Sequence, residues 1–461
     1  MYSPSITTST GFLTPEAERD SAASANLLFV GAAVALISLA YILPLGPAWA
    51  RSTQEHFLVA ELMESGAEQG TLGRQFGLGA LGLFGLLALA WPDGKSLRTR
   101  GALGVLCLAF VAWCGLSLLW AIDKSGSFRR FVALGCEATA ALAIARRASM
   151  RQLVWIVFAC SAIWLGLGIL AEVSHGTFRP WQTGYRFAGL FHPNESASAS
   201  SVLALSSLYL ATRGEQRKRW LWAVAIVAAG FVVLSGSRTA LFAMLLAAVL
   251  VWAMQMRFGR LVVWGMAASW LAIIAALVMG SWLMETGSGA ISLGRVDQEN
   301  STLTGRIPLW QELMEQVGKR PLTGYGYNAF WTVDNIRSIS DSQGWDLSAA
   351  HSAYIDLVLS VGLIGAVLCL VPMFLGVARS MQFERRAPGL GYGFTAMLLL
   401  LALLCGLTET TIGATWFLAL FGMCGLAHVA FEVREIVPQQ GPRSERTTLE
   451  PPRLKRIETS S

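Results

Sequence analysis

The sequence predicts an all-α integral membrane protein with about twelve transmembrane helices. Of its 461 residues, 54% are hydrophobic and only 14% are charged, whereas soluble proteins carry about a quarter charged residues. The chain also has 17 tryptophans, 22 phenylalanines and 46 glycines, and aromatic residues and glycine are frequent in membrane helices. Finally, the apolar residues gather in long runs with short polar connections. This composition excludes an ordinary soluble enzyme.

A helix needs about 20 mostly apolar residues to cross a bilayer. The runs that qualify are 27–44, 76–91, 102–121, 131–146, 153–172, 195–212, 220–236, 238–256, 261–283, 352–379, 391–409 and 412–431. The residues before the first run are polar and include Asp and Glu, so we expect an uncleaved first helix rather than a signal peptide. The seven cysteines all lie inside apolar runs and are expected to be buried free thiols.

Lys and Arg in the short loops predict the orientation, because they are enriched on the cytoplasmic side. The segments "KSLRTR", "RRASMR", "TRGEQRKR", "RFGR" and "RSMQFERR" share one side, and "DKSGSFRR" on the other side is the exception. The net charge of +6 is therefore explained by topology, and we expect no nucleic-acid partner.

This orientation divides the chain into five parts. They are a cytoplasmic N-terminal tail (1–26), helices one to nine (27–283), a large outward-facing loop (284–351), helices ten to twelve (352–431) and a polar cytoplasmic tail (432–461). An outer loop of this length is expected to be functional. Its "DQE" segment, with Asp297 and Glu299, either holds a divalent ion or is a solvated loop; we expect no metal.

Polar residues gather in four segments at the predicted outer face. Arg238 of "LSGSRTALFAML" lies in a turn between two apolar runs, where a guanidinium is costly unless it pairs or reaches water. It is a functional candidate, although arginines near helix ends also extend to the interface without further role. Arg186, His192 and Asn194 of "GYRFAGLFHPNESASAS" are either site residues or ordinary loop residues.

The third segment is "LTGRIPLWQELMEQVGKRPLTGYGYNAFW". Its apolar residues recur at helical spacing from Leu309 to Val317, which predicts an amphipathic helix that begins at Pro308 and ends at Gly318 and lies on the membrane surface or against the bundle. Arg306 then lies at the N-terminal end of this helix, where the backbone N–H groups favour an anion. The glycine-rich turn that follows is suited to stacking on a sugar ring, or to anchoring at the membrane interface.

The fourth segment, "AAHSAYIDLVLSVGLIG", places His351 directly before an apolar run. A lone histidine there is most simply a helix cap or an interfacial residue. Three arginines on the same predicted face change that interpretation. Guanidinium groups bind phosphate in a bidentate manner, and an imidazole can accept a proton near neutral pH. The combination is suited to a phosphate ester.

The motifs "RFAGLFHPNESA", "SGSRTALFA", "TGRIPLW…RPLTGYGYNAFW" and "HSAYIDLVLSVGLIG", in this order, resemble the O-antigen ligase and O-antigen/exopolysaccharide polymerase superfamily. The resemblance covers the chain from 185 to 366. "GYGYNAFW" is most similar to exopolysaccharide polymerase members. This chain has Ser352 where the family often has Asn, and Ile307 where it often has Thr.

The resemblance implies an inverting glycosyltransferase of the bacterial inner membrane that acts at the periplasmic face without metal or cofactor. The donor would be a glycan on undecaprenyl pyrophosphate. The acceptor would be another lipid-linked repeat unit for a polymerase, or lipid A–core for a ligase. Such an enzyme works in the lipid bilayer, with a chain-length regulator and export machinery as candidate partners.

The resemblance also implies roles for individual residues. Arg186, Arg238 and Arg306 match pyrophosphate-binding arginines, Arg238 best. Arg238 and His351 are the catalytic candidates, with His351 activating or positioning the acceptor hydroxyl. The candidate glycan contacts are Tyr325, Tyr327, Trp331, His192 and Asn194.

Two alternatives stay open at this point. A ligase shares the donor chemistry and differs only in its acceptor. A secondary transporter or a flippase for the lipid-linked glycan belongs to another class, and transporters often have two similar halves. The outer loop 284–351 interrupts any such symmetry here, and the charged residues gather at one face instead of mid-membrane.

Overall fold

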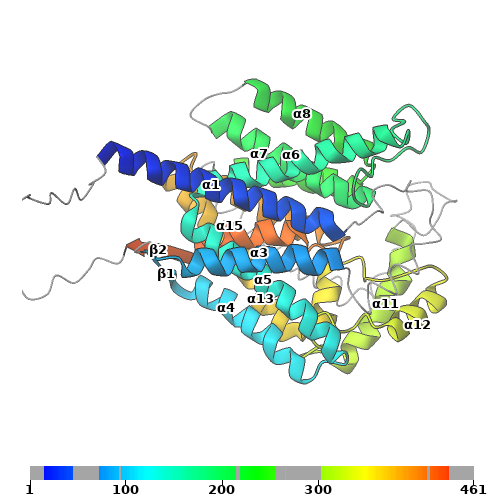
Figure 1. The fold of residues 1–461 in the computed structure, drawn as a ribbon. Helices are drawn as coiled ribbons and strands as arrows, with labels where there is room; N and C mark the ends of the chain where they lie inside the picture. Colours follow the sequence, from blue (N-terminus) through cyan, green and yellow to red (C-terminus); the bar gives the residue numbers. More distant parts are fainter. Residues whose placement is uncertain are drawn as a thin grey trace, which may run out of the picture.

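The computed structural model describes residues 15–44, 72–92, 95–213, 219–255, 265, 303–412 and 416–435. Most of the helices lie lengthwise in one bundle (Figure 1). The helices are α1 (Pro15–Ile42), α3 (Leu72–Ala90), α4 (Gly101–Leu116), η2 (Ser117–Leu119), α5 (Lys124–Arg147), α6 (Met150–Ser174), α7 (Pro193–Arg213), α8 (Arg219–Leu234), α9 (Arg238–Met254), α11 (Leu303–Lys319), α12 (Val333–Gln343), α13 (Ala353–Arg386), α14 (Tyr392–Cys405) and α15 (Phe417–Ala430).

Every predicted run except 261–283 overlaps one of the helices named above, and 261–283 lies outside the described residues apart from residue 265. Among the helices of the described residues, 4 are long and apolar enough to cross a membrane: Leu72–Ala90, Gly101–Leu119, Met150–Ser174 and Ala353–Arg386. Shorter apolar helices, such as α9 and α14, lie beside them. The fold is that of a mostly helical, multi-pass membrane protein, and the total of twelve spans stays a prediction.

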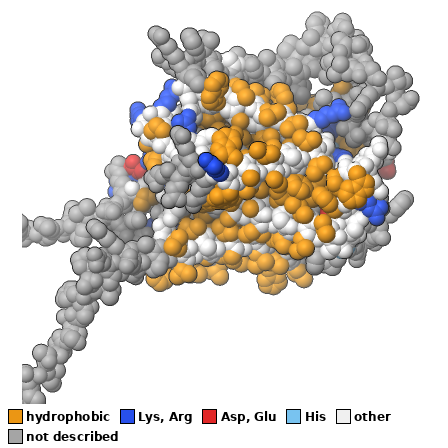
Figure 2. All heavy atoms as spheres, turned by 90° about the horizontal axis from the view of Figure 1, so that it is seen from above, with side chains coloured by type: hydrophobic (Ala, Val, Ile, Leu, Met, Phe, Trp, Pro, Cys, Tyr) orange, Lys and Arg blue, Asp and Glu red, His pale blue; other side chains and the backbone are white. Residues whose placement is uncertain are grey.

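The bundle exposes many large apolar side chains, which would be unfavourable in contact with water. Phe76 and Ile226 are 73% and 69% exposed, and Figure 2 shows apolar side chains across the middle of one face, with Lys and Arg mostly toward its two margins. Contiguous exposed apolar surface of this extent marks contact with a membrane.

One end of the bundle departs from the all-α prediction. Strands β1 (Lys95–Thr99) and β2 (Phe431–Glu435) form an antiparallel pair in which Lys95 faces Glu435 and Arg98 faces Glu432. The opposite charges of Arg98 and Glu432, which are paired across the ladder, favour this register. The ribbon ties the segment before α4 to the end of α15, and it lies at the opposite end from α11 and α12 (Figure 1). We call the latter the α11 end.

The amphipathic helix in the outer loop is confirmed, but its predicted start is wrong. Helix α11 begins at Leu303 and contains Pro308 in its interior, so the helix has already formed when it reaches Arg306. Its apolar face is buried at Leu309, Leu313 and Val317. A proline close to the first turn loses only one backbone hydrogen bond, and the buried face is sufficient to hold the helix.

Helix α13 is interrupted, although its sequence predicts one continuous span. Gly362 has φ 68° and ψ −178°, and a Cβ there would lie 2.1 Å from the carbonyl oxygen of Leu322. The glycine-rich turn occupies the interruption: the Leu363 N–H donates to the Pro321 oxygen (2.9 Å) and the Tyr325 N–H donates to the Leu359 oxygen (2.8 Å). The turn is thus a structural connection between α11 and α13.

Candidate functional site

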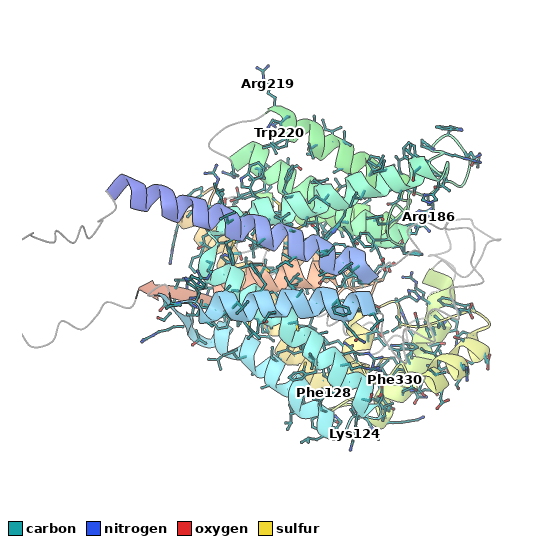
Figure 3. The ribbon with its side chains drawn as sticks, in the orientation of Figure 1. Lys124, Phe128, Arg186, Arg219, Trp220 and Phe330 are labelled. Atoms are coloured by element: carbon teal, nitrogen blue, oxygen red, sulfur yellow. The ribbon has the colours of Figure 1, made fainter. Side chains whose placement is uncertain are left out.

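Four segments meet at the α11 end of the bundle. They are the loop before α7, the start of α9, the start of α11, and the turn 406–412 between α14 and α15. Arg186 and Phe330 both lie at this end (Figure 3). We call Arg186, Arg238 and Arg306, one from each of the first three segments, the arginine cluster.

A buried carboxylate fixes the loop that carries Arg186. Oε1 of Glu172 accepts the backbone N–H groups of Ala188 and Gly189, both at 2.8 Å. Its Oε2 accepts the Tyr185 hydroxyl at 2.5 Å. These bonds hold the backbone on both sides of Arg186, so its guanidinium is positioned before any ligand arrives.

A chain of polar contacts connects Arg186 to Arg306. The Arg186 Nε donates to the Ser235 oxygen (2.8 Å), and its Nη2 donates to Asn194 Oδ1 (2.8 Å). The Asn194 Nδ2 donates to Glu409 Oε1 (2.8 Å). The same oxygen lies 3.5 Å from Arg306 Nη2. Arg306 therefore faces the Glu409 carboxylate directly, and Arg186 is linked to it through Asn194.

Arg238 is the third member of the arginine cluster, and its contacts differ from those of Arg186 and Arg306. Arg306 donates to the carbonyl oxygen of Thr408, and the Thr408 hydroxyl bonds the Thr239 hydroxyl at 2.9 Å, which brings the start of α9 to the same turn. Arg238 is exposed, and within the described part of the chain no hydrogen bond or ion pair engages its guanidinium. Helix α9 begins at this residue, so its first N–H groups also favour an anion.

His351 lies beside this cluster. Its imidazole stacks on Trp345, with ring centroids 5.6 Å apart and planes at 24°. Its backbone has φ 49°, an unusual value for a residue other than glycine. Burial, followed by the charges of Arg306 and His192, lowers the pKa of His351 to about 4. The imidazole is neutral at neutral pH and is a weak base there.

Asp356 joins three parts of the site. Its Oδ1 accepts the Trp331 indole N–H (2.8 Å) and the Ala350 N–H (3.1 Å), and its Oδ2 accepts the Thr410 hydroxyl (2.7 Å). It thereby fixes the residue before His351 against the turn 406–412. All three donors are neutral, which is typical of a positioning role.

Ser352 follows His351 and is 0% exposed. Its hydroxyl has no hydrogen-bond partner in the described structure, and it does not cap α13 although it occupies the N-cap position. The family's more frequent Asn is therefore replaced here by a side chain that adds no polar contact.

The structure separates the predicted glycan contacts. Tyr327 is 1% exposed and its ring faces the apolar interior, so its surface is closed to a sugar in this conformation. Tyr325 is 9% exposed, and its hydroxyl donates to the Gln316 oxygen (2.9 Å). Asn194 is engaged by Arg186 and Glu409, whereas His192 is exposed and Trp331 is half-buried.

Glu409 was not predicted from the sequence. It belongs to "TETT", a short segment between two apolar runs whose only evident feature was its lack of basic residues. A carboxylate on the same predicted face as three arginines is the signal that could have identified it. Asp356 and Glu172 could have been identified in the same way, although less readily, because each lies within an apolar helix.

The arrangement is suited to an anion rather than a metal. Among the described residues, no group of three or more His, Cys, Asp or Glu side chains is placed to hold a metal ion. Asp297 and Glu299, the predicted alternative, lie outside the described residues. Guanidinium groups from separate elements can bind the non-bridging oxygens of a phosphate in a bidentate manner.

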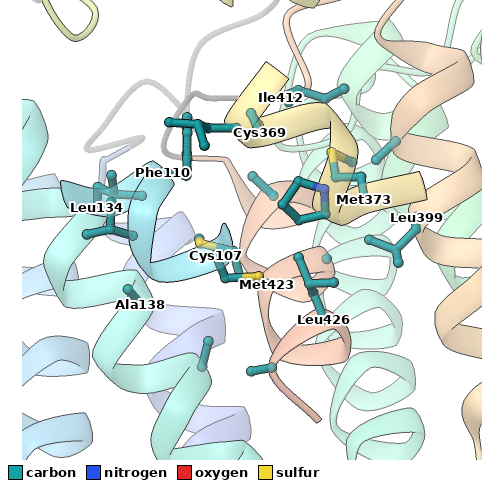
Figure 4. Close-up of a pocket in the computed structure, with 18 of the residues that line it drawn as sticks. Cys107, Phe110, Leu134, Ala138, Cys369, Met373, Leu399, Ile412, Met423 and Leu426 are labelled. Carbon is teal, nitrogen blue, oxygen red and sulfur yellow. The ribbon is translucent and has the colours of Figure 1, made fainter. Parts of the chain in front are cut away.

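An apolar cavity of about 150 Å³ lies between α4, α5, α13 and α15 (Figure 4). Cys107, Phe110, Cys369 and Met423 contribute to its walls, and no charged side chain lines it. A cavity with this lining can hold hydrocarbon.

Comparisons with known proteins agree with the predicted family. The sequence model of the O-antigen ligase family matches residues 223–370, which include Arg238, Arg306 and His351. The "Exopolysaccharide production protein ExoQ" of Rhizobium meliloti is 28% identical over 332 residues, 67% of this chain and 73% of that protein. The "General O-oligosaccharyltransferase" of Acinetobacter baylyi is 25% identical over 219 residues, 44% of this chain and 37% of that protein. Over these residues the chain is similar to the O-antigen ligase family, in agreement with the resemblance of its motifs to the O-antigen ligase and O-antigen/exopolysaccharide polymerase superfamily.

Proposed function

We propose that the protein is a glycosyltransferase of the bacterial inner membrane that moves a glycan from undecaprenyl pyrophosphate to an acceptor sugar hydroxyl at the periplasmic face. The observation that carries this proposal is the arginine cluster at the α11 end, with His351 beside it. Arg306 faces the Glu409 carboxylate, Arg186 is linked to it through Asn194, and Arg238 is exposed without a protein partner in the described residues.

The proposed glycosyl transfer requires few groups besides those of the arginine cluster. Pyrophosphate is a good leaving group, so the protein must stabilise the negative charge that grows on it and orient the acceptor. Arg238 and Arg306 are assigned to the pyrophosphate, and Arg186 supports them from the neighbouring loop. His351, neutral and held against Trp345, is assigned to the acceptor side.

We favour polymerisation of exopolysaccharide or O-antigen repeat units. The relative that shares the larger part of this chain is named for exopolysaccharide production. The alternative is transfer to lipid A–core or to another acceptor, and the name of the second relative, an O-oligosaccharyltransferase, supports it. The docked glycine-rich turn favours neither, because Tyr325 and Tyr327 are buried.

The proposal is tested with purified protein and undecaprenyl-pyrophosphate-linked repeat units. A ladder of products would establish a polymerase, and transfer only to added lipid A–core would establish a ligase. No consumption of the lipid-linked glycan would refute both and favour transport.

Variants connect this activity to the site. Arg238→Ala and His351→Ala are expected to abolish long-chain polysaccharide in cells at unchanged membrane abundance. Arg219→Ala is the matched control, because Arg219 lies at the start of α8, away from Arg186 (Figure 3). Normal polymer from both site variants would contradict the proposed site.

A further inference from the structure

We propose that the carboxylate of Glu409 removes the proton from the acceptor hydroxyl, an inference that rests on the glycosyl transfer proposed above. Glu409 lies in the turn between α14 and α15, outside both helices. No motif of the sequence pointed to it. The geometry of its two oxygens carries the inference.

The two oxygens of Glu409 have different surroundings. Oε1 accepts the Asn194 amide (2.8 Å) and faces Arg306 Nη2 (3.5 Å). Oε2 makes no hydrogen bond with the described residues, and it is not among the buried polar atoms that lack partners. The side chain is 23% exposed. One oxygen is thus anchored, and the other is open to a substrate.

The anchored oxygen also places the carboxylate next to the leaving group. Arg306 and, through Asn194, Arg186 are assigned to the pyrophosphate. The backbone of Glu409 accepts the Ala353 N–H at 3.2 Å, which holds it beside the segment of His351. Glu409 therefore lies between the donor side and the acceptor side of the site.

The other carboxylates at this end are engaged differently. Both oxygens of Asp356 accept hydrogen bonds from three neutral donors. Glu195 caps the start of α7, where its Oε2 accepts the His192 N–H at 3.3 Å. Both oxygens of Glu172 are likewise occupied. Among the described residues of this site, only Glu409 combines an open oxygen with contact to the arginine cluster.

Its protonation behaviour is compatible with this role. Burial raises the pKa of Glu409 above its ordinary value, and Arg306, Asn194 and Arg186 counteract that rise. The imidazole of His351 has its pKa lowered to about 4. A base is most effective when its pKa lies near the working pH, so Glu409 is the better acceptor of the proton and His351 is the better positioning group.

The step balances without a co-reactant. The acceptor oxygen forms a bond to the anomeric carbon while its proton passes to Oε2 of Glu409. The bond from the anomeric carbon to the pyrophosphate oxygen breaks, and its electron pair leaves with the pyrophosphate, where the arginine cluster stabilises it. The proton on Glu409 is then released to water.

The test compares Glu409→Gln with Glu315→Gln, since Glu315 is an exposed glutamate on the polar face of α11. The probe is undecaprenyl-pyrophosphate-linked oligosaccharide extracted from a strain that lacks this protein. We expect kcat of Glu409→Gln to fall by about 100-fold or more, the usual contribution of a general base. The KM for the donor and the melting temperature should change little, because the amide oxygen can replace Oε1.

Sodium azide then separates proton removal from a structural role. Azide attacks the anomeric carbon without losing a proton, so Glu409→Ala with azide should release a glycosyl azide of inverted configuration. Wild-type turnover by Glu409→Gln would overturn the inference. Absence of glycosyl azide from a folded Glu409→Ala would also overturn it, because the carboxylate would then serve only to hold the arginines. A wild-type protein that consumes no donor would instead refute the proposed function itself.

Discussion

Two carboxylates at opposite ends of the bundle show how surroundings decide what a charged residue does. Glu384, near the end of α13, is 2% exposed and accepts the Tyr209 hydroxyl (2.9 Å) and the N–H groups of Gly389 (3.1 Å) and Gly393 (2.9 Å). Glu409 contacts one amide and one guanidinium, and it keeps one oxygen open.

The difference lies in the donors. The donors to Glu384 are neutral. Gly389 lies in the turn between α13 and α14, Gly393 in the first turn of α14 and Tyr209 in α7, so the carboxylate closes that turn. The donors to Glu409 belong to side chains that a phosphate would also bind. A saturated carboxylate stabilises a fold, whereas one that shares its partners with a ligand can respond to that ligand.

The largest effect is expected from Arg306. Arg306→Ala removes the arginine that faces Glu409 and a contact proposed for the pyrophosphate, so transfer should fall by about 10²–10³-fold. Turnover of the purified variant with lipid-linked oligosaccharide measures this. Lys319→Ala removes a cation from the other end of the same helix and should leave turnover unchanged. Equal activity of the two variants would contradict a functional role for this end of α11.

The second prediction concerns the other carboxylate. Glu384→Ala leaves three donors, two of them buried, without an acceptor, which should lower stability by about 3–5 kcal/mol. Thermal unfolding in detergent measures the loss, and turnover per folded molecule should stay near the wild-type value. Tyr209→Phe, which removes one donor, should cost about 1 kcal/mol. If the turnover of Glu384→Ala fell without a loss of stability, Glu384 would serve the reaction and not the fold, and the contrast with Glu409 would be wrong.

The third prediction is a pH dependence at the α11 end. The pKa of His351 is lowered to about 4 from its ordinary value of 6.5, so between these values the unfolded chain binds more protons than the folded protein. Stability should therefore fall as the pH drops from 6.5 toward 4. Melting temperatures at several pH values test this, and His351→Gln should show a shallower decline. Parallel curves for the two proteins would show that His351 is not responsible.

Much of the fold follows from the sequence, because runs of apolar residues leave few alternatives to membrane helices. The register of the amphipathic face from Leu309 to Val317 was equally readable. The start of α11 was not, since a proline is a stronger local signal than a buried face that forms only on folding. The interruption at Gly362 depends on a carbonyl group from another segment, Leu322, which no local pattern reveals.

The site was predicted in part. The three arginines and His351 were predicted to share one face, and the structure links Arg186 to Arg306 through Asn194 and Glu409. What could not be predicted is the carboxylate between them, because Glu409 is 103 residues from Arg306 and its role depends on distance in space. Tyr327 was predicted to contact a glycan because an aromatic residue in a polar segment is expected to be exposed. In the structure, packing against other segments buries it.

The smallest effect is expected next to the histidine itself. Ser352 is fully buried, and its hydroxyl has no partner among the described residues. Removing an unsatisfied buried hydroxyl costs little and often stabilises, so Ser352→Ala should change the free energy of unfolding by less than about 1 kcal/mol, in the stabilising direction. Melting temperature and turnover should both stay close to wild type. A large loss of turnover at unchanged stability would mean that this hydroxyl finds its partner in the substrate, and the acceptor side of the site would then extend from His351 into the first turn of α13.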